Sequence, residues 1–130
     1  MMDYTIQEGL LYSEDHEWVR VEDGKAFIGI SGYAAHHLGD IVFVELPEVD
    51  TEVQAGNNIG VIESVKAVAD MHTPVSGMVV EINEELETSP ELLNQDSYTN
   101  YIAVIEINNQ KELAELMDAT AYQKYCEQLD

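Results

Sequence analysis

Basic residues and cysteine are scarce in this chain. Its 130 residues include five Lys or Arg against 26 Asp or Glu, which gives a formal net charge of −21 at pH 7. So acidic a surface repels phosphate backbones and anionic lipids, and we expect it to bind neither nucleic acid nor a membrane. The single cysteine, Cys126, excludes an intramolecular disulfide and a cysteine metal cluster.

Long apolar runs are missing as well. No stretch reaches the roughly 20 residues that span a bilayer, and the N-terminal M-M-D-Y-T lacks the basic region of a signal peptide and the arginines of a transit peptide. We therefore expect a soluble, cytoplasmic protein of the bacterial type. Apolar residues still make up 45% of the chain, enough to close a modest core. The length predicts one domain over residues 1–130.

Short strands joined by tight turns are predicted in the first third of the chain, and one further strand is predicted late in the chain. The predicted strands are 16–21, 25–30, 41–46 and 102–107. Asp23-Gly24 predicts a tight hairpin between the first two strands, since both residues tolerate positive φ. The run 41–46 is almost continuously apolar and stops at Pro47, so we expect a strand that is buried on both faces.

Glycine and proline interrupt the middle of the chain, and helices are predicted around it. The breaks between residues 53 and 82 are Gly56, Gly60, Pro74 and Gly77, a spacing typical of a small barrel or sandwich. Ser31 and Gly39 mark the two ends of a short helix. Two late segments have apolar residues at helical spacing. These are Leu113, Leu116 and Met117, and then Tyr122, Tyr125, Cys126 and Leu129.

Lys66 is the most informative residue. It is one of four lysines and stands within E-S-V-K-A, at the tip of a predicted hairpin. A charge at that place can simply discourage edge-to-edge pairing of strands. A nucleophilic lysine would have to lose its proton, which the acids nearest in sequence, Glu63 and Asp70, disfavour. A third interpretation is that Lys66 is itself the substrate of a modifying enzyme.

The spacing around Lys66 resembles the lipoyl-attachment hairpin of the barrel-sandwich hybrid fold. Gly56 lies ten residues before the lysine, Gly77 lies eleven after it, and Glu63 precedes it by three. Biotin carriers share this fold but have methionine on both sides of the lysine, where this chain has valine and alanine. The hairpin is therefore more similar to the lipoyl type.

Over nearly its whole length, the chain is similar to the H-protein family of the glycine cleavage system. The matching motifs are H-E-W-V (16–19), L-G-D-I-V-F-V-E-L-P (38–47), E-S-V-K-A (63–67), P-V-S-G (74–77), V-V-E-I-N-E-E-L (79–86) and D-A-T-A-Y (118–122). This resemblance implies a mainly β barrel-sandwich hybrid of the lipoyl/biotinyl-carrier type, with short peripheral and C-terminal helices. It also implies lipoic acid attached to Lys66 as N6-lipoyllysine, with Glu63 as a recognition residue for the attaching enzyme.

The resemblance further implies a non-catalytic shuttle with several partners. Glycine decarboxylase would load an aminomethyl group, an aminomethyltransferase would remove it, and dihydrolipoyl dehydrogenase would reoxidise the dithiol. A lipoyl-attaching enzyme would modify the carrier beforehand. In this family the loaded arm folds back into a cleft, and the matching acids here are Glu17, Asp70 and Asp15, the last replacing a small polar residue. The alternative is that these acids lie on a solvated surface.

One segment departs from the family pattern. After Asp96 the family has proline, tyrosine, a glycine pair and tryptophan, whereas this chain reads S-Y-T-N-Y-I. Losing the glycines removes freedom for positive φ, so we expect a different local backbone. This departure keeps open an H-like lipoyl carrier of another lipoate-dependent pathway, such as sulfur metabolism or a regulatory modification system. An unlipoylated structural homologue is a second alternative to glycine cleavage.

The four histidines do not predict a metal site. His36 and His37 are adjacent, so on a helix their side chains point about 100° apart. His16 and His72 are far from them and from each other in sequence. The lone Trp18 is expected to be part of the core rather than an exposed binding residue.

Overall fold

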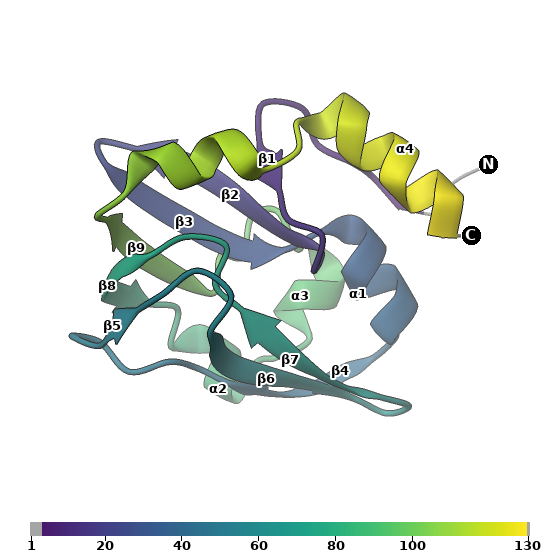
Figure 1. Ribbon diagram of the computed structural model, residues 1–130. Helices are drawn as coiled ribbons and strands as arrows, with labels where there is room; N and C mark the ends of the chain where they lie inside the picture. Colours follow the sequence, from purple (N-terminus) through teal and green to yellow (C-terminus); the bar gives the residue numbers. More distant parts are fainter. Residues whose placement is uncertain (1–3, 130) are drawn as a thin grey trace.

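The computed structural model describes residues 4–129 and shows a mainly β architecture with short helices around it (Figure 1). Met1–Asp3, which belong to the segment used above to predict localisation, lie outside the described residues, as does Asp130. The strands are β1 (Leu11–Tyr12), β2 (Glu17–Glu22), β3 (Lys25–Ile30), β4 (Ile41–Glu45), β5 (Glu52–Val53), β6 (Asn58–Ser64), β7 (Val68–His72), β8 (Gly77–Ile82) and β9 (Ala103–Ile107). The helices are α1 (Gly32–Leu38), α2 (Glu85–Thr88), α3 (Leu92–Gln95) and α4 (Ala119–Leu129), together with the 3₁₀ helix η1 (Gln110–Glu115).

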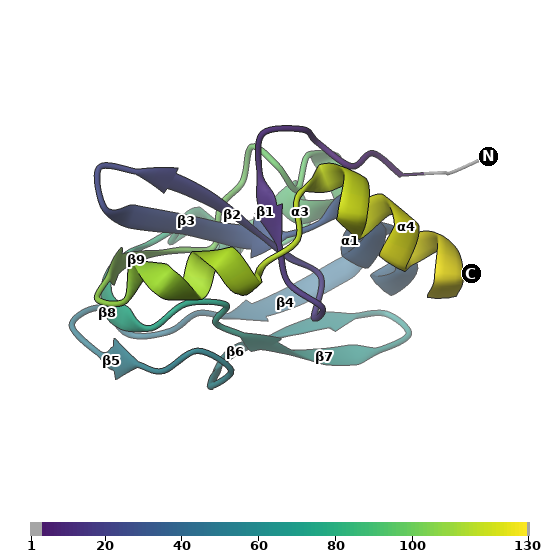
Figure 2. The ribbon, with the colours of Figure 1, turned by 45° about the horizontal axis from the view of Figure 1, so that its top comes forward.

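Two antiparallel sheets face each other across one aliphatic core. The larger sheet has the order β1-β2-β3-β9-β8-β5 and the smaller one β4-β6-β7. Figure 2 shows the smaller sheet lying beneath strands β1 to β3. Side chains from both sheets fill the space between them, among them Ile28, Val79 and Ile105 from the larger sheet and Val44, Ile62 and Met71 from the smaller one. The predicted barrel-sandwich architecture is thus confirmed.

Local turn chemistry places the strands and the first helix as the sequence predicts. Asp23 and Gly24 have φ of 51° and 77° and connect β2 to β3. The Ser31 hydroxyl accepts the N–H of Ala34 at 3.1 Å and caps α1, and Gly39, with φ of 77°, ends it. Because α1 stops there, the chain enters β4 beside the β6–β7 hairpin.

An aromatic cluster attaches α4 to the sandwich. The Tyr122 ring stacks on that of Tyr12 with centroids 4.3 Å apart, and its hydroxyl lies 2.7 Å from Ser31 Oγ. Cys126, one turn further along, is buried in the same cluster, as is Trp18. Trp18 is therefore a core residue, as predicted. No helix in residues 4–129 is long and apolar enough to cross a membrane.

Two sequence expectations about packing are wrong. The strand β4 is not buried on both faces, because Val42 and Phe43 are 55% and 46% exposed. β4 is an edge strand whose outer face is uncovered, and a bulge between Ile41 and Phe43 shifts its register. Leu116 and Met117 do not continue a helix: η1 ends before them, and Met117 instead exchanges two backbone hydrogen bonds with Tyr12.

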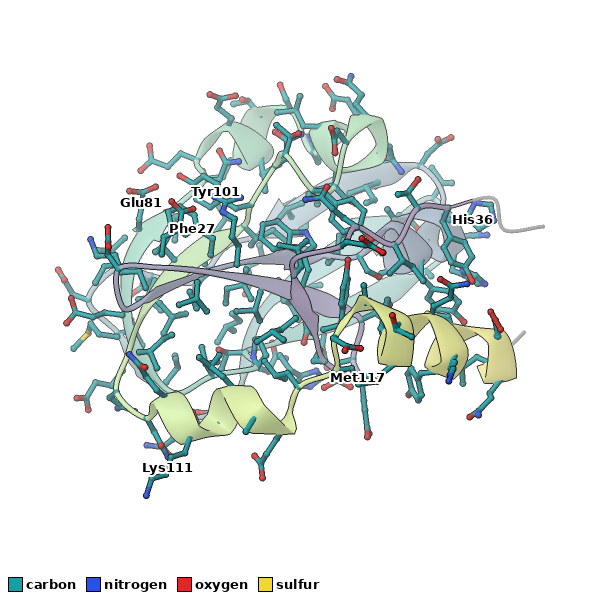
Figure 3. All side chains as sticks on the ribbon, turned by 90° about the horizontal axis from the view of Figure 1, so that it is seen from above. Phe27, His36, Glu81, Tyr101, Lys111 and Met117 are labelled. Carbon is teal, nitrogen blue, oxygen red and sulfur yellow. The ribbon has the colours of Figure 1, made fainter. Side chains whose placement is uncertain are left out.

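The segment that departs from the family pattern is ordered by side-chain hydrogen bonds instead of glycine. The Asp96 carboxylate accepts the backbone N–H groups of Tyr98 and Thr99 and the Thr99 hydroxyl. The Tyr101 hydroxyl donates to the Glu81 carboxylate, and its ring meets Phe27 edge-on (Figure 3). The non-glycine residues with positive φ in residues 4–129 all lie elsewhere, so this segment needs no left-handed backbone.

Candidate functional site

Lys66 lies at the tip of the β6–β7 hairpin, which projects from the smaller sheet (Figure 1). The Ser64 N–H donates to the carbonyl of Ala67 at 2.8 Å, and the Ser64 hydroxyl accepts the N–H groups of Lys66 and Ala67 at 3.3 and 3.0 Å. Val65 and Lys66 are exposed. The turn therefore has a defined backbone shape while its lysine faces solvent.

The hairpin tip is also tied to the end of α1. The Val65 N–H donates to the carbonyl of Asp40 at 3.0 Å. A Cβ atom added to Gly39 would lie 3.3 Å from Lys66 Cε, closer than an ordinary van der Waals contact. Glycine at this position therefore leaves the room that the lysine stem occupies. Glu63 is half-buried near the end of β6 and pairs with Phe43 and Val68 on the neighbouring strands.

Glu17, at the start of β2, is a buried acid with only 2% of its surface exposed. Its carboxylate accepts the Ser13 hydroxyl at 2.6 Å and the backbone N–H of His72 at 3.2 Å. Burial raises the pKa of Glu17 to about 8, against the opposing effect of these two hydrogen bonds. The interpretation of Glu17 as a solvated surface acid is therefore wrong.

A tight turn brings Asp15 beside Glu17. The Ser13 N–H donates to the carbonyl of Glu17 at 2.9 Å, and the N–H of His16 donates to the carbonyl of Ser13 at 3.1 Å. His16 has φ of 69°, the left-handed conformation that this turn requires. Asp15 is exposed, and its Oδ2 lies 3.8 Å from Nδ1 of His72.

The predicted cleft residues are therefore only partly brought together. Asp15 and Glu17 meet around His72, whereas the exposed Asp70 lies two residues before His72 on β7 and makes no hydrogen bond or ion pair with either acid. Sequence reasoning missed His72, which is 55 residues from Glu17 along the chain. No local pattern signals that contact, because it depends on how the hairpin packs against β2.

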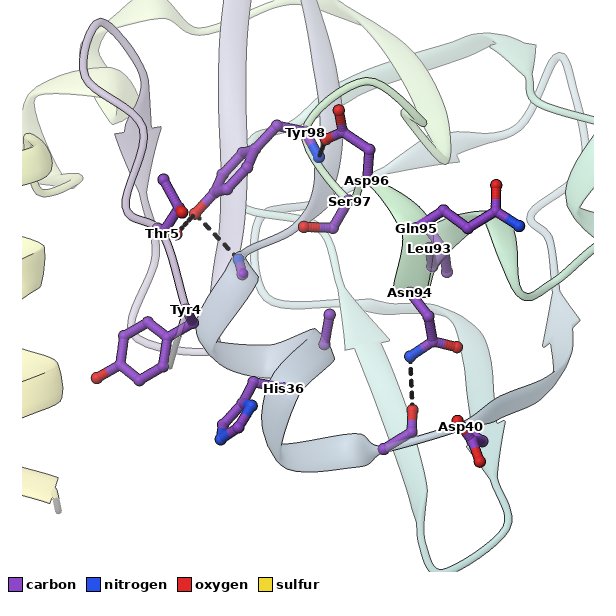
Figure 4. Close-up of a pocket in the computed structure, with 13 residues that line it drawn as sticks. Tyr4, Thr5, His36, Asp40, Leu93, Asn94, Gln95, Asp96, Ser97 and Tyr98 are labelled. Carbon is purple, nitrogen blue, oxygen red and sulfur yellow. Dashed lines mark hydrogen bonds between the residues drawn. The ribbon is translucent and has the colours of Figure 1, made fainter. Parts of the chain in front are cut away.

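A polar pocket of about 410 Å³ lies between α1 and α3 (Figure 4). The Tyr98 hydroxyl closes one end: it donates to the carbonyl of Thr5 and accepts the N–H of Gly32. The Asn94 amide donates to the carbonyl of Gly39 at 2.7 Å. None of the site residues predicted from the sequence lines this pocket, so the candidate site is formed by the hairpin and the start of β2.

Comparison with known proteins gives one consistent result. The family model for the glycine cleavage H-protein matches residues 10–129. The chain is 57% identical over 122 residues to a glycine cleavage system H protein of Syntrophomonas wolfei, covering 94% of each chain. It is 54% identical over 129 residues to a probable glycine cleavage system H protein of Thermococcus gammatolerans, covering 98% of this chain and 96% of the relative. A crystal structure of a glycine cleavage system H protein from Mycobacterium marinum superimposes with a TM-score of 0.84 at 34% identity, covering 95% of this chain and 98% of that one.

Proposed function

The chain belongs to the glycine cleavage H-protein family, and from this premise we propose that it is the lipoyl carrier of a glycine cleavage system, with lipoic acid bound through an amide to Lys66. The observation that carries the proposal is the exposed Lys66 on a turn of defined shape. The residues at the tip fit such a group, because Gly39 leaves room for the lysine stem and Lys66 is exposed to solvent. A modifying enzyme would recognise the backbone shape of the turn together with Glu63.

The carrier would serve three enzymes without catalysing a reaction itself. When attached, the dithiolane carries an aminomethyl group from glycine decarboxylase to the aminomethyltransferase, and dihydrolipoyl dehydrogenase then reoxidises it. The protein contributes a rigid sandwich that docks and a tip that presents the arm. A tethered arm raises the effective concentration of its cargo at each active site, which is the advantage of a carrier over free diffusion.

Glu17, Asp15 and Asp70 would shelter the loaded arm. Glu17 is a buried carboxylate whose hydrogen-bond donors, Ser13 and the N–H of His72, are neutral. A protonated amine placed beside Glu17 would supply the positive charge that its two neutral donors do not provide. The amine and the carboxylate would then form a charge-assisted hydrogen bond. The exposed Asp15 and Asp70 would add weaker attraction.

Peptide mass mapping of the protein made in lipoate-supplied cells tests the attachment. We expect one lipoyl adduct per chain, on the peptide that contains Lys66. Lys66→Arg should abolish the adduct with its melting temperature unchanged, because one solvated cation replaces another. Lys111→Arg, also exposed, is the matched control and should be lipoylated normally. An adduct on another lysine, or none in wild type, would refute the proposal.

The segment after Asp96 favours a second candidate, an H-like lipoyl carrier of another lipoate-dependent pathway. Its Tyr101 donates a hydrogen bond to the Glu81 carboxylate, a contact that a glycine could not make. Glycine-dependent exchange of carbon dioxide, measured with the lipoylated chain and a glycine decarboxylase, separates the two candidates. Exchange supports glycine cleavage, and its absence with a fully lipoylated chain supports the second candidate.

A further inference from the structure

We propose that Asp15, Glu17 and His72 form a binding site for one divalent transition-metal ion in the carrier without a loaded arm. The ion and the cargo amine would exclude each other, because both would lie beside Glu17. One carboxylate oxygen from each acid and a ring nitrogen of the histidine all lie within 4.8 Å of one another. The site lies at the start of β2 and the end of β7, away from Lys66 at the hairpin tip. The sequence predicted no metal site from its adjacent and scattered histidines, and no local pattern places His72 beside the two acids.

The donor set determines the class of ion. Two carboxylate oxygens and one imidazole nitrogen suit zinc, manganese, iron or cobalt, whereas calcium and magnesium favour ligand sets made of oxygen alone. Three protein ligands leave further coordination positions to water, as in open zinc sites. Asp15 is exposed and can adjust its position, so an ion can enter from solvent on that side.

The ring of His72 provides an independent observation. Its Nδ1 atom is buried, with less than 1 Å² accessible, and has no hydrogen-bond partner. The nearby Asp15 Oδ2, at 3.8 Å, is beyond hydrogen-bond distance. A buried nitrogen left without a partner costs free energy. An ion between Nδ1 and the carboxylates would satisfy it.

The charge balance also favours a cation. Glu17 is buried, and in residues 4–129 no lysine or arginine forms an ion pair with it or with Asp15. The charged partner of Asp15 is His72, at 3.8 Å, and a divalent ion would add the positive charge that the two neighbouring acids lack. Ser13 donates to Glu17 Oε1 at 2.6 Å and fixes the carboxylate, as the partners that orient metal ligands commonly do.

Zinc titration of the full-length, unlipoylated chain tests the proposal. Isothermal calorimetry in about 0.15 M salt, which screens loose attraction to the acidic surface, should show one Zn²⁺ bound per chain. Nitrogen NMR should show the Nδ1 resonance of His72 shifting as Zn²⁺ is added. The buried Cys126 is not a competing ligand.

Three variants make the result specific. Asp15→Asn and His72→Gln should each weaken Zn²⁺ binding by at least about tenfold, since each removes a direct ligand and loss of a merely supporting residue already costs 10- to 100-fold. His36→Gln is the matched control, an exposed histidine outside the trio, and should bind normally. Asp15 is exposed, so its variant should keep the fold even if the histidine variant does not.

Either of two results would overturn the metal site. The first is that Zn²⁺ does not bind stoichiometrically and the His72 nitrogen resonance does not shift. Asp15 and His72 would then form only an ion pair with each other. The second is binding of equal strength in all three variants, which would mean a diffuse counterion effect. Lipoylation of Lys66 is read separately by mass, so failure of the metal site is distinguishable from failure of the proposed function.

Discussion

The tip of the β6–β7 hairpin and the start of β2 hold their ionisable side chains in opposite ways. Lys66 is exposed, and its turn is held mainly by backbone groups and one serine hydroxyl within the residues 64–67, with one further backbone hydrogen bond from Val65 to Asp40. Glu17 is buried, and one of its partners, the N–H of His72, comes from a distant strand. The tip is thus a mostly local structure that presents its lysine to solvent, whereas the Glu17 site is a tertiary structure that raises the pKa of its acid. Substitutions should separate the two.

The largest effect of a single substitution on stability at fixed pH should arise at the root of the same hairpin. A Cβ atom added to Gly60 in β6 would overlap the backbone carbonyl of Glu45 in β4, which cannot move without breaking the sheet. We expect Gly60→Ala to lower the free energy of unfolding by about 3 kcal/mol. Urea denaturation measures this. Val65→Ala, at the exposed tip, is the control and should change it by less than about 0.5 kcal/mol. Equal losses would mean that tip and root are not independent.

The next effect is a pH dependence that belongs to Glu17. Burial raises its pKa to about 8, above its ordinary value near 4.5 in an unfolded chain. The folded state therefore binds the extra proton, and the resulting stability is complete below pH 4.5 and is lost as the pH rises towards 8. The slope approaches about 1.4 kcal/mol per pH unit between these values. Glu17→Gln should remove it while keeping the shape of the side chain.

Unfolding free energies at pH 5, 6.5 and 8, measured with a chelator present, test this prediction. The difference between wild type and Glu17→Gln should change steadily across the series in favour of the variant as the pH rises. Lys66→Arg is the control at the hairpin tip and should run parallel to wild type at every pH. A parallel line for Glu17→Gln would show that Glu17 is not the titrating group.

The difference between local and tertiary contacts also explains which features could be predicted from the sequence. The turn at Asp23-Gly24, the Ser31 cap and the Lys66 hairpin were predictable, because each depends on residues close together in the chain. The burial of Glu17 beside His72 was not, since it requires knowing how β7 packs against β2. The exposure of Phe43 was missed for a similar reason: an apolar strand does not reveal that its sheet has one uncovered face.

A smaller effect is expected on the lifetime of the loaded arm. If Glu17 pairs with the amine of the cargo, Glu17→Gln removes a charge-assisted hydrogen bond of about 1.5–3 kcal/mol. The methylamine-loaded carrier should then decay at least about tenfold faster in buffer, while lipoylation of Lys66 proceeds as in wild type. Release of formaldehyde over time measures the decay. An unchanged rate would show that Glu17 does not shelter the arm.

The smallest effect should come from Asp70, which places a carboxylate on β7 without burying it. It is exposed and makes no hydrogen bond or ion pair with Glu17 or Asp15. An exposed ion pair contributes about 0.2–1 kcal/mol, so Asp70→Asn should speed decay of the loaded carrier by only about twofold. Salt distinguishes the two acids, because screening reaches exposed charges and not buried ones. Raising the ionic strength to about 1 M should therefore erase the difference between Asp70→Asn and wild type while most of the Glu17→Gln difference persists. A tenfold effect of Asp70→Asn that survives high salt would place Asp70 inside the cleft with Glu17, and the contrast between exposed and buried acids would then fail at this position.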